Sequence, residues 1–287
     1  MASTRQIKSR IRSVSSNKQI TKAMELVASS KLRRAQEQAL STKRFNDVAL
    51  DILATLAATT DVRLSPLYEK RKTKNRMIIV LTSDRGLAGA YNANALKLLV
   101  KKVRSDDERG INTMVITVGR KAANFVAKLK DVEAHSSYQL AEHVTVDDVR
   151  PILKTAVDMF LSGEIDNVKV ITTRFVNSFT QTAELMNLLP AGPKDIETHQ
   201  AVGDPKFEPS TEEVLDYVTT RLVEAQLFQA VLDARASEHA MRRVAMKNAS
   251  DNASEIVDAL TLEMNKVRQA AITQELSEIS AGVEAMS

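Results

Sequence analysis

Apolar residues recur every three or four positions near the start of the chain, which is the spacing of one helix face. Ser3 and Gln6 form an S-x-x-Q capping box before this pattern. We therefore predict one long helix from about Thr4 to Thr59, interrupted in its seam around residues 15–18. The first positions of its apolar face are Ile7, Ile11, Val14, Ile20, Met24 and Val27.

The end of the chain repeats this pattern over a longer stretch. Pro209 precedes an S-x-x-E capping box made by Ser210 and Glu213. Every proline and glycine except Gly282 lies between Pro66 and Pro209. Because both residues disrupt helices, the two arms that lack them are predicted to be long helices. The apolar positions of the second helix are Val214, Val218, Leu222, Ala225, Phe228, Leu232, Ala253, Ile256, Leu260, Val267 and Ala270.

The two arms carry opposite charge, although the formal net charge of the whole chain is only +4. Residues 1–45 hold 11 Lys and Arg against 2 Asp and Glu, whereas residues 209–287 hold 7 against 13. Charge can therefore steer the arms together while apolar burial holds them. Since a compact middle domain joins them, an antiparallel coiled coil is the arrangement expected.

The middle of the chain alternates apolar strand-like runs with helix-like runs. Such alternation predicts βαβ units and a mainly parallel sheet. The fold class is therefore α/β: a long antiparallel two-helix coiled coil from the N- and C-termini plus a central Rossmann-like α/β domain. The expected domains are residues 1–60, 61–208 and 209–287. Strands are expected at 77–81, 114–118 and 168–173, and helices at 91–104, from 120 to about 129, and from 145 to about 163.

Composition excludes several kinds of site. The chain has no cysteine, so it has no disulfide framework and no thiolate metal site. Its four histidines fall in separate segments without metal-ligand spacing, and no stretch approaches the roughly 20 apolar residues that a membrane span needs. Residues 1–24 are basic and rich in serine, as in a transit peptide, but their apolar spacing continues into the helix and favours its first turns.

The densest local motif is residues 83–92, Ser-Asp-Arg-Gly-Leu-Ala-Gly-Ala-Tyr-Asn, which follow a strand and open a helix. Ligands often bind there in α/β folds, but the motif matches neither G-x-G-x-x-G nor the P-loop pattern. It therefore favours a structural or docking turn, with a nucleotide-dependent enzyme as the alternative. A coiled-coil nucleic-acid binder is a second alternative, which the basic first arm allows. Only Phe45 is aromatic in residues 1–45, however, so base stacking is not supported.

Two segments, residues 20–32 and 265–279, mix small, polar and charged residues where a plain seam would repeat leucine. In an antiparallel pair they lie at the same end, which suits contact with another protein surface. These segments, the 83–92 turn, the first residues from Arg5 and residues 244–253 together resemble the gamma subunit of F-type ATP synthases. The resemblance covers nearly the whole chain.

The resemblance implies a rotor rather than an enzyme. In that family the terminal helices form an axle inside a ring of alpha and beta subunits, and the α/β domain forms a foot at the epsilon subunit and the membrane c-subunit ring. It implies no catalytic residue, no cofactor, no metal, no nucleic acid and no direct membrane insertion. The implied location is the cytoplasmic face of a bacterial inner membrane, as a peripheral subunit of the complex.

By matching position, the resemblance also implies contact residues. Those implied to face the alpha and beta ring are Met24, Arg242, Arg268, Gln269, Thr273 and Glu275, and those implied for the foot are Phe207, Glu208 and Pro209. The chain departs from the family pattern at Ala88, where cysteine is common, at Arg243, where methionine is usual, and at residues 280–282. It also lacks the two-cysteine insertion of chloroplast members, so thiol regulation is not expected.

Overall fold

A computed structural model describes residues 4–59, 65–129, 132–191 and 210–286. The two predicted long helices are present with nearly the expected bounds, as α1 (Thr4–Thr59) and α5 (Thr211–Met286). The chain forms two compact units. One combines residues 1–28 with residues 242–287, and the other comprises residues 29–241. Each unit contains a segment of both helices. The division by sequence into residues 1–60, 61–208 and 209–287 stays a prediction.

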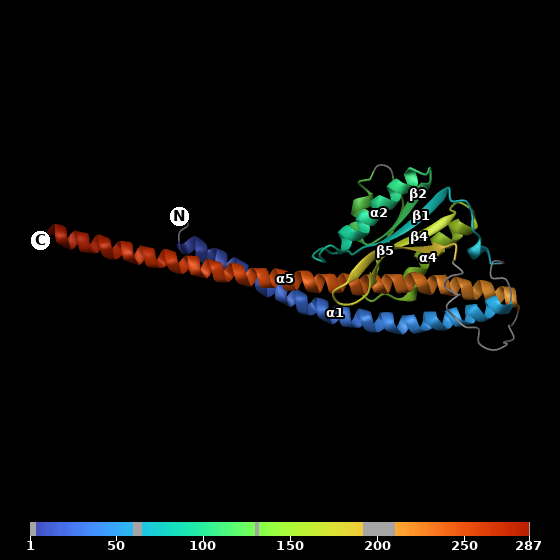
Figure 1. The fold of residues 1–287 in the computed structure, drawn as a ribbon, viewed down its shortest axis with the longest axis horizontal. Helices are drawn as coiled ribbons and strands as arrows, with labels where there is room; N and C mark the ends of the chain where they lie inside the picture. Colours follow the sequence, from blue (N-terminus) through green and yellow to red (C-terminus); the bar gives the residue numbers. More distant parts are fainter. Residues whose placement is uncertain (1–3, 60–64, 130–131, 192–209, 287) are drawn as a thin grey trace. The chain divides into compact units, whose positions relative to one another are not determined.

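In the first unit the start of α1 lies beside α5 and runs in the opposite direction (Figure 1). The seam is thin and uses small residues: Ala28 of α1 and Ala253 of α5 are buried together with Ile7, Met246 and Leu260. Small side chains let two helix backbones approach closely, which explains a seam that does not repeat leucine. The expected antiparallel pairing of the termini is therefore seen within this unit.

The second unit is built on a five-stranded sheet. Its strands are β1 (Asn75–Leu81), β2 (Asn112–Val118), β3 (Glu133–Tyr138), β4 (Asn167–Phe175) and β5 (Gln181–Leu189). They are ordered β3-β2-β1-β4-β5, with the first four parallel and β5 antiparallel to β4. The predicted fold class, α/β with a mainly parallel sheet, is confirmed.

Helices cover both faces of this sheet, which is why residues 77–81 of β1 form an unbroken apolar run. The helices α2 (Tyr91–Asp107) and α3 (Arg120–Val126) bury one face through residues such as Leu99 and Ala122. The helix α4 (Val146–Leu161) and residues 215–234 of α5 bury the other. A short helix, η2 (Pro66–Tyr68), adds Leu67 and Tyr68 to that second core.

Two strands, β3 and β5, escaped prediction because they lie at the edges of the sheet. β3 consists mainly of polar residues, and none of its side chains is fully buried. β5 places polar residues such as Glu184 and Asn187 among apolar ones. An edge strand is partly solvated and needs no continuous apolar run, so a search for such runs passes over it.

The structure shows a reciprocal capping box at α4 and a single side-chain cap at α5. At α4, the backbone N–H of Thr145 donates to Asp148 Oδ2 at 2.8 Å. The hydroxyl of Thr145 bonds to the same carboxylate. These two hydrogen bonds, of which the backbone one has the larger effect, hold the pKa of Asp148 below its usual value. At α5, the N–H of Glu213 donates to Ser210 Oγ at 3.2 Å. The Ser3 box lies outside the described residues.

A buried charged cluster in the second unit joins the end of α2 to β1. Asp106 is fully buried and accepts hydrogen bonds from Arg76 of β1 and from Lys102 Nζ, the latter at 2.6 Å. Burial alone would raise the pKa of Asp106, but the two cations outweigh it and the pKa lies below its usual value. The cluster therefore ties α2 to β1 by charge as well as by apolar packing.

Candidate partner-contact surfaces

The exposed end of α5 carries four of the six residues expected to face a ring. Arg268, Gln269, Thr273 and Glu275 all lie on its surface, and every described side chain from Arg268 to residue 281 is exposed. A helix stretch of this length with no buried side chain has no packing partner among the described residues of its own unit. Such a stretch depends on another molecule if its apolar residues are to be buried.

Met24 and Arg242 lie elsewhere in the same unit. Both are half-buried, and Arg242 stands about 39 Å along the helix axis from Arg268, at about 1.5 Å per residue. The structure therefore groups the four residues from 268 to 275 but does not place Arg242 with them. Arg243, one of the departures from the family pattern, is also half-buried.

The exposed end of α5 also has an apolar face that was not singled out from the sequence. Ile272, Leu276 and Ile279 are 49%, 60% and 64% exposed. Their spacing of four and then three residues places them on one side of the helix. A surface of this kind on a folded chain marks an interaction site. This apolar face could have been found from the sequence, since its three residues are spaced as on one side of a helix.

The first helix presents a second exposed apolar group in the same unit. Ile20, Leu26 and Val27 are each more than half exposed. Nearby, Lys22 forms an ion pair with Glu25 at 2.9 Å. The 20–32 segment therefore combines apolar side chains with paired charge at its surface, as expected for a protein contact.

The 83–92 turn is closed by its own hydrogen bonds. Ser83 is fully buried, its N–H donates to Asn92 Oδ1 at 3.0 Å, and its hydroxyl donates to the carbonyl of Arg85 at 2.6 Å. Asp84 Oδ1 accepts the N–H of Arg120 at 3.0 Å, so the turn also caps α3. Polar groups of the turn are thus used to hold its own shape and to cap α3, which favours the structural or docking interpretation.

The exposed tip of this turn is Leu87. Its φ is +63°, in the left-handed region that a residue with a branched side chain rarely adopts, and its side chain is 61% exposed. Ala88 beside it is buried, so the turn has room there for a small side chain. A strained, exposed leucine on a rigid turn suits docking better than ligand enclosure.

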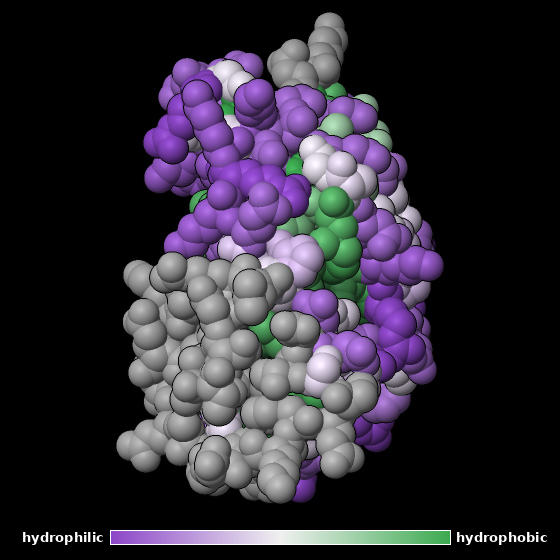
Figure 2. Space-filling view, turned by 90° about the vertical axis from the view of Figure 1, so that its right-hand side faces the viewer, coloured by the Kyte–Doolittle hydropathy of each residue, from purple (hydrophilic) through white to green (hydrophobic). Residues whose placement is uncertain are grey.

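The foot residues Phe207, Glu208 and Pro209 lie outside the described residues. Seen from the side where α1 ends and α5 begins, the described surface gathers apolar side chains in a recess between hydrophilic walls (Figure 2). Within the described part of the chain, no group of three or more His, Asp or Glu residues is placed to hold a metal ion. In that same part, no helix combines the length and apolar character required to cross a membrane.

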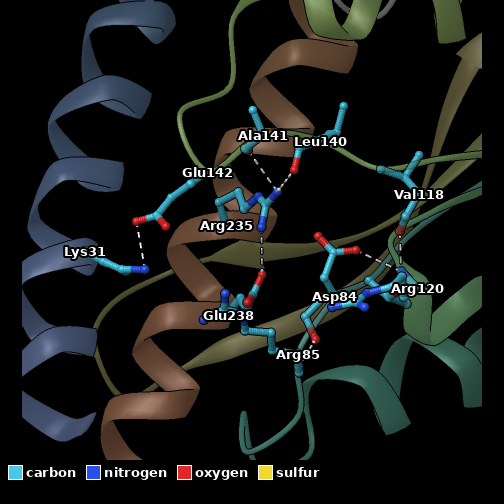
Figure 3. A network of polar contacts seen from close by, with 12 residues as sticks. Lys31, Asp84, Arg85, Val118, Arg120, Leu140, Ala141, Glu142, Arg235 and Glu238 are labelled. Carbon is cyan, nitrogen blue, oxygen red and sulfur yellow. Dashed lines mark hydrogen bonds and ion pairs between the residues drawn. The ribbon is translucent and has the colours of Figure 1, made fainter. Parts of the chain in front are cut away.

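The segment from Leu140 to Arg150, which we call the collar segment, joins β3 to α4 and holds both long helices within the second unit. Toward α1, Glu142 pairs with Lys31 at 2.7 Å (Figure 3), and the carbonyl of Val144 accepts a hydrogen bond from Gln38 at 2.7 Å. The Lys31 hydrogen bond holds the pKa of Glu142 below its usual value, against a smaller opposing effect of burial.

Toward α5, the collar segment makes contact at two levels. Arg235 donates to the carbonyls of Leu140 and Ala141 at 3.0 and 3.2 Å (Figure 3). Three turns earlier on α5, Glu224 accepts hydrogen bonds from Arg150 at 2.8 Å and from Arg221 at 2.6 Å. The Glu224 side chain is only 7% exposed, so this carboxylate depends on both guanidinium groups for its neutralisation.

The sheet holds α5 from another side. The Thr172 hydroxyl of β4 donates to the carbonyl of Ala230 at 2.9 Å, and the Ser237 hydroxyl of α5 donates to the carbonyl of Thr173 at 2.9 Å. All four residues that take part in these bonds lie in the second unit. The α/β domain is therefore fastened to α5 by buried hydrogen bonds in addition to its apolar core.

Comparison with known proteins gives a consistent result. A family model described as ATP synthase matches residues 3–286. ATP synthase gamma chains of Xanthomonas axonopodis, Staphylococcus saprophyticus and Roseiflexus castenholzii are 39%, 38% and 41% identical to this chain. The alignments cover all of this chain and 99–100% of each relative.

Solved structures share the fold. A chain of the mitochondrial ATP synthase of Euglena gracilis, in an OSCP/F1/c-ring structure, matches with a TM-score of 0.67 at 18% identity, covering 99% of this chain and 94% of that one. A chain of the Tetrahymena thermophila central stalk and c-ring matches with a TM-score of 0.61 at 22% identity, covering 80% and 99%. With full-length relatives near 40% identity and a family model spanning almost every residue, the chain belongs to the ATP synthase gamma chain family.

Proposed function

We propose that this chain is the rotating central shaft of an ATP synthase, coupling ion flow through a membrane ring to ATP synthesis in catalytic subunits. Membership of the gamma chain family, which is a non-catalytic subunit of the complex, supports the role. The observation that carries it is the end of α5, where residues 268–281 are exposed and Ile272, Leu276 and Ile279 form an uncovered apolar face. That end fits a surrounding protein surface.

Such a shaft acts through contact rather than chemistry. A rotating helix end presents different side chains to each surrounding subunit in turn, and it shifts a subunit only by binding one of its conformations better than the others. The end of α5 is asymmetric in this way, with an apolar face and with Arg268 and Glu275 exposed beside it. The ring-facing roles of Met24 and Arg242 belong to the same proposal.

The partners follow from the same role. The ring would consist of alpha and beta subunits, and the foot would meet an epsilon subunit and the membrane c-subunit ring. The Euglena and Tetrahymena structures whose chains share this fold both include a c-ring. Phe207, Glu208 and Pro209 are proposed as foot contacts, and the complex is proposed to sit on the cytoplasmic face of a bacterial inner membrane.

Reconstitution tests the proposal. The full-length chain, mixed with alpha and beta subunits from the same organism, should yield an ATPase complex that contains one copy of it. A variant that ends at residue 267 removes the exposed stretch and should assemble poorly. Full assembly of the truncated variant would contradict the role given to this stretch.

The two alternative functions have their own tests. Saturable nucleotide binding by the chain alone, measured by calorimetry, would favour a nucleotide-dependent enzyme. Affinity for DNA or RNA that falls steeply with salt would favour a nucleic-acid binder. We expect neither, because the 83–92 turn is closed and because basic residues of α1 are engaged in ion pairs such as Lys31–Glu142.

A further inference from the structure

We propose that the collar segment, residues 140–150, transmits torque between the α/β domain and both long helices. This inference rests on the proposed shaft function and names the element that makes it work. A domain that turns a two-helix shaft must hold both helices, since a grip on one alone would let the other slip around it. The collar segment holds both, and it does so within one compact unit.

The contacts of the collar segment with α5 are partly buried and charged. The Arg235 side chain is 19% exposed and reaches two successive carbonyls, which fixes the orientation of its planar guanidinium. The Arg150 contact with Glu224 lies 11 residues away, or about 16 Å along the helix at about 1.5 Å per residue. Two attachment points separated along an axis resist tilting as well as rotation.

The contacts of the collar segment with α1 are more exposed to solvent. The Lys31 and Glu142 side chains are 30% and 69% exposed, and the Gln38 contact to Val144 is partly buried. Both α1 residues lie on the side of the helix that faces the collar segment, two turns apart. Because β4 contacts α5 directly through Thr172 and Thr173, the collar segment matters most for α1.

The local structure makes the collar segment stiff enough for this task. Its middle is pinned by the capping box of Thr145 and Asp148, and its end is the first turn of α4. Val144 is buried, which anchors the segment in the apolar core. A loop fixed at its end and centre can pass on a force without bending.

Single-molecule rotation of the reconstituted complex tests the inference. The ring is fixed to a surface, and a bead is attached to the α/β domain through Glu108→Cys, an exposed position in a chain that has no other cysteine. During pauses in rotation, the variance of the bead angle is inversely proportional to the torsional stiffness of the shaft. The double variant Lys31→Ala with Gln38→Ala should raise this variance about twofold, because it removes the polar attachment of α1.

Matched variants separate torque transfer from general disturbance. Arg33→Ala with Glu37→Ala removes a 3.1 Å ion pair that lies entirely on the exposed surface of α1, and it should leave the variance unchanged. Lys31→Glu alone should raise the variance, and adding Glu142→Lys should bring it back, because the exchanged charges attract again. Restoration of this kind would not be expected from a merely structural effect on α1.

The outcomes distinguish the two proposals. If the parent complex fails to rotate on ATP, the shaft function itself is wrong. If the parent complex rotates and the Lys31 and Gln38 variants show the same angular variance as the Arg33 control, the shaft function stands and the role of the collar segment is refuted. A raised variance that the charge exchange restores supports it.

Discussion

Replacement of Asp106 by asparagine should strongly destabilise the second unit. The carboxylate is fully buried and faces two cations, Arg76 and Lys102. Asparagine keeps the size of the side chain but removes its charge. Two cations would then remain around an uncharged group, with the Arg76 side chain only 8% exposed.

The expected magnitude follows from that burial. Removing one partner of a buried ion pair costs about 3–5 kcal/mol. The lower part of this range applies here, because Lys102 can extend its amine into solvent while Arg76 cannot. For a unit the size of residues 29–241, about 3 kcal/mol corresponds to a fall in melting temperature of roughly 6–12 °C.

Calorimetry of the full chain measures the fall, and hydrogen exchange of peptides from β1 and α2 locates it. Asp107→Asn is the matched control, since Asp107 is the next residue of α2 and is exposed. Asp106→Leu with Arg76→Met should recover part of the loss, because apolar groups then replace the buried pair and Lys102 can extend its amine into solvent. Equal melting temperatures for Asp106→Asn and Asp107→Asn would refute the reasoning.

The same carboxylate sets a pH dependence. The pKa of Asp106 is lower in the folded chain than its ordinary value of 3.8, so the unfolded chain binds the proton more readily. Its contribution to stability is therefore complete above that ordinary value and is lost as the pH falls through the lower, folded-state pKa. Asp106→Asn should flatten this part of the profile of unfolding free energy against pH.

Three further predictions concern the helix surfaces and one turn. Met24→Lys adds a cation to a basic helix, so coupling of rotation to synthesis should fall while assembly persists; unchanged ions pumped per ATP would count against this. Leu276→Gln should leave the melting temperature of the free chain unchanged but weaken its affinity for the ring about tenfold or more, measured by titration, because one buried leucine contributes about 1.5–3 kcal/mol. Gly119→Ala should destabilise the second unit by more than Gly110→Ala, because a Cβ at 119 would lie 2.2 Å from the Thr82 carbonyl oxygen whereas the space at 110 is open; equal calorimetric shifts would contradict this.

The long helices and the buried strands were readable from the sequence for a common reason. In each of them the same burial requirement recurs along the element, so the sequence pattern is strong. It appears as helical spacing over 56 and 76 residues, and as the continuous apolar run within β1. Edge strands such as β3 need less apolar burial, so their sequence pattern is weak and they were missed. The family resemblance supplied Arg268, Gln269, Thr273 and Glu275 as contact residues, and the structure showed them exposed on one stretch.

The sequence by itself determined the two terminal helices, the alternation that makes a parallel sheet, and the absence of cysteine chemistry, because each is a property of neighbouring residues. Only the tertiary structure decided how the collar segment meets Lys31 and Arg235, or that Asp106 lies buried between two cations. Apart from Lys102, which precedes Asp106 by four residues, those contacts join residues 30 to 111 positions apart along the chain. No local pattern encodes such a pairing, since it exists only once the sheet, α4 and the two long helices have packed together.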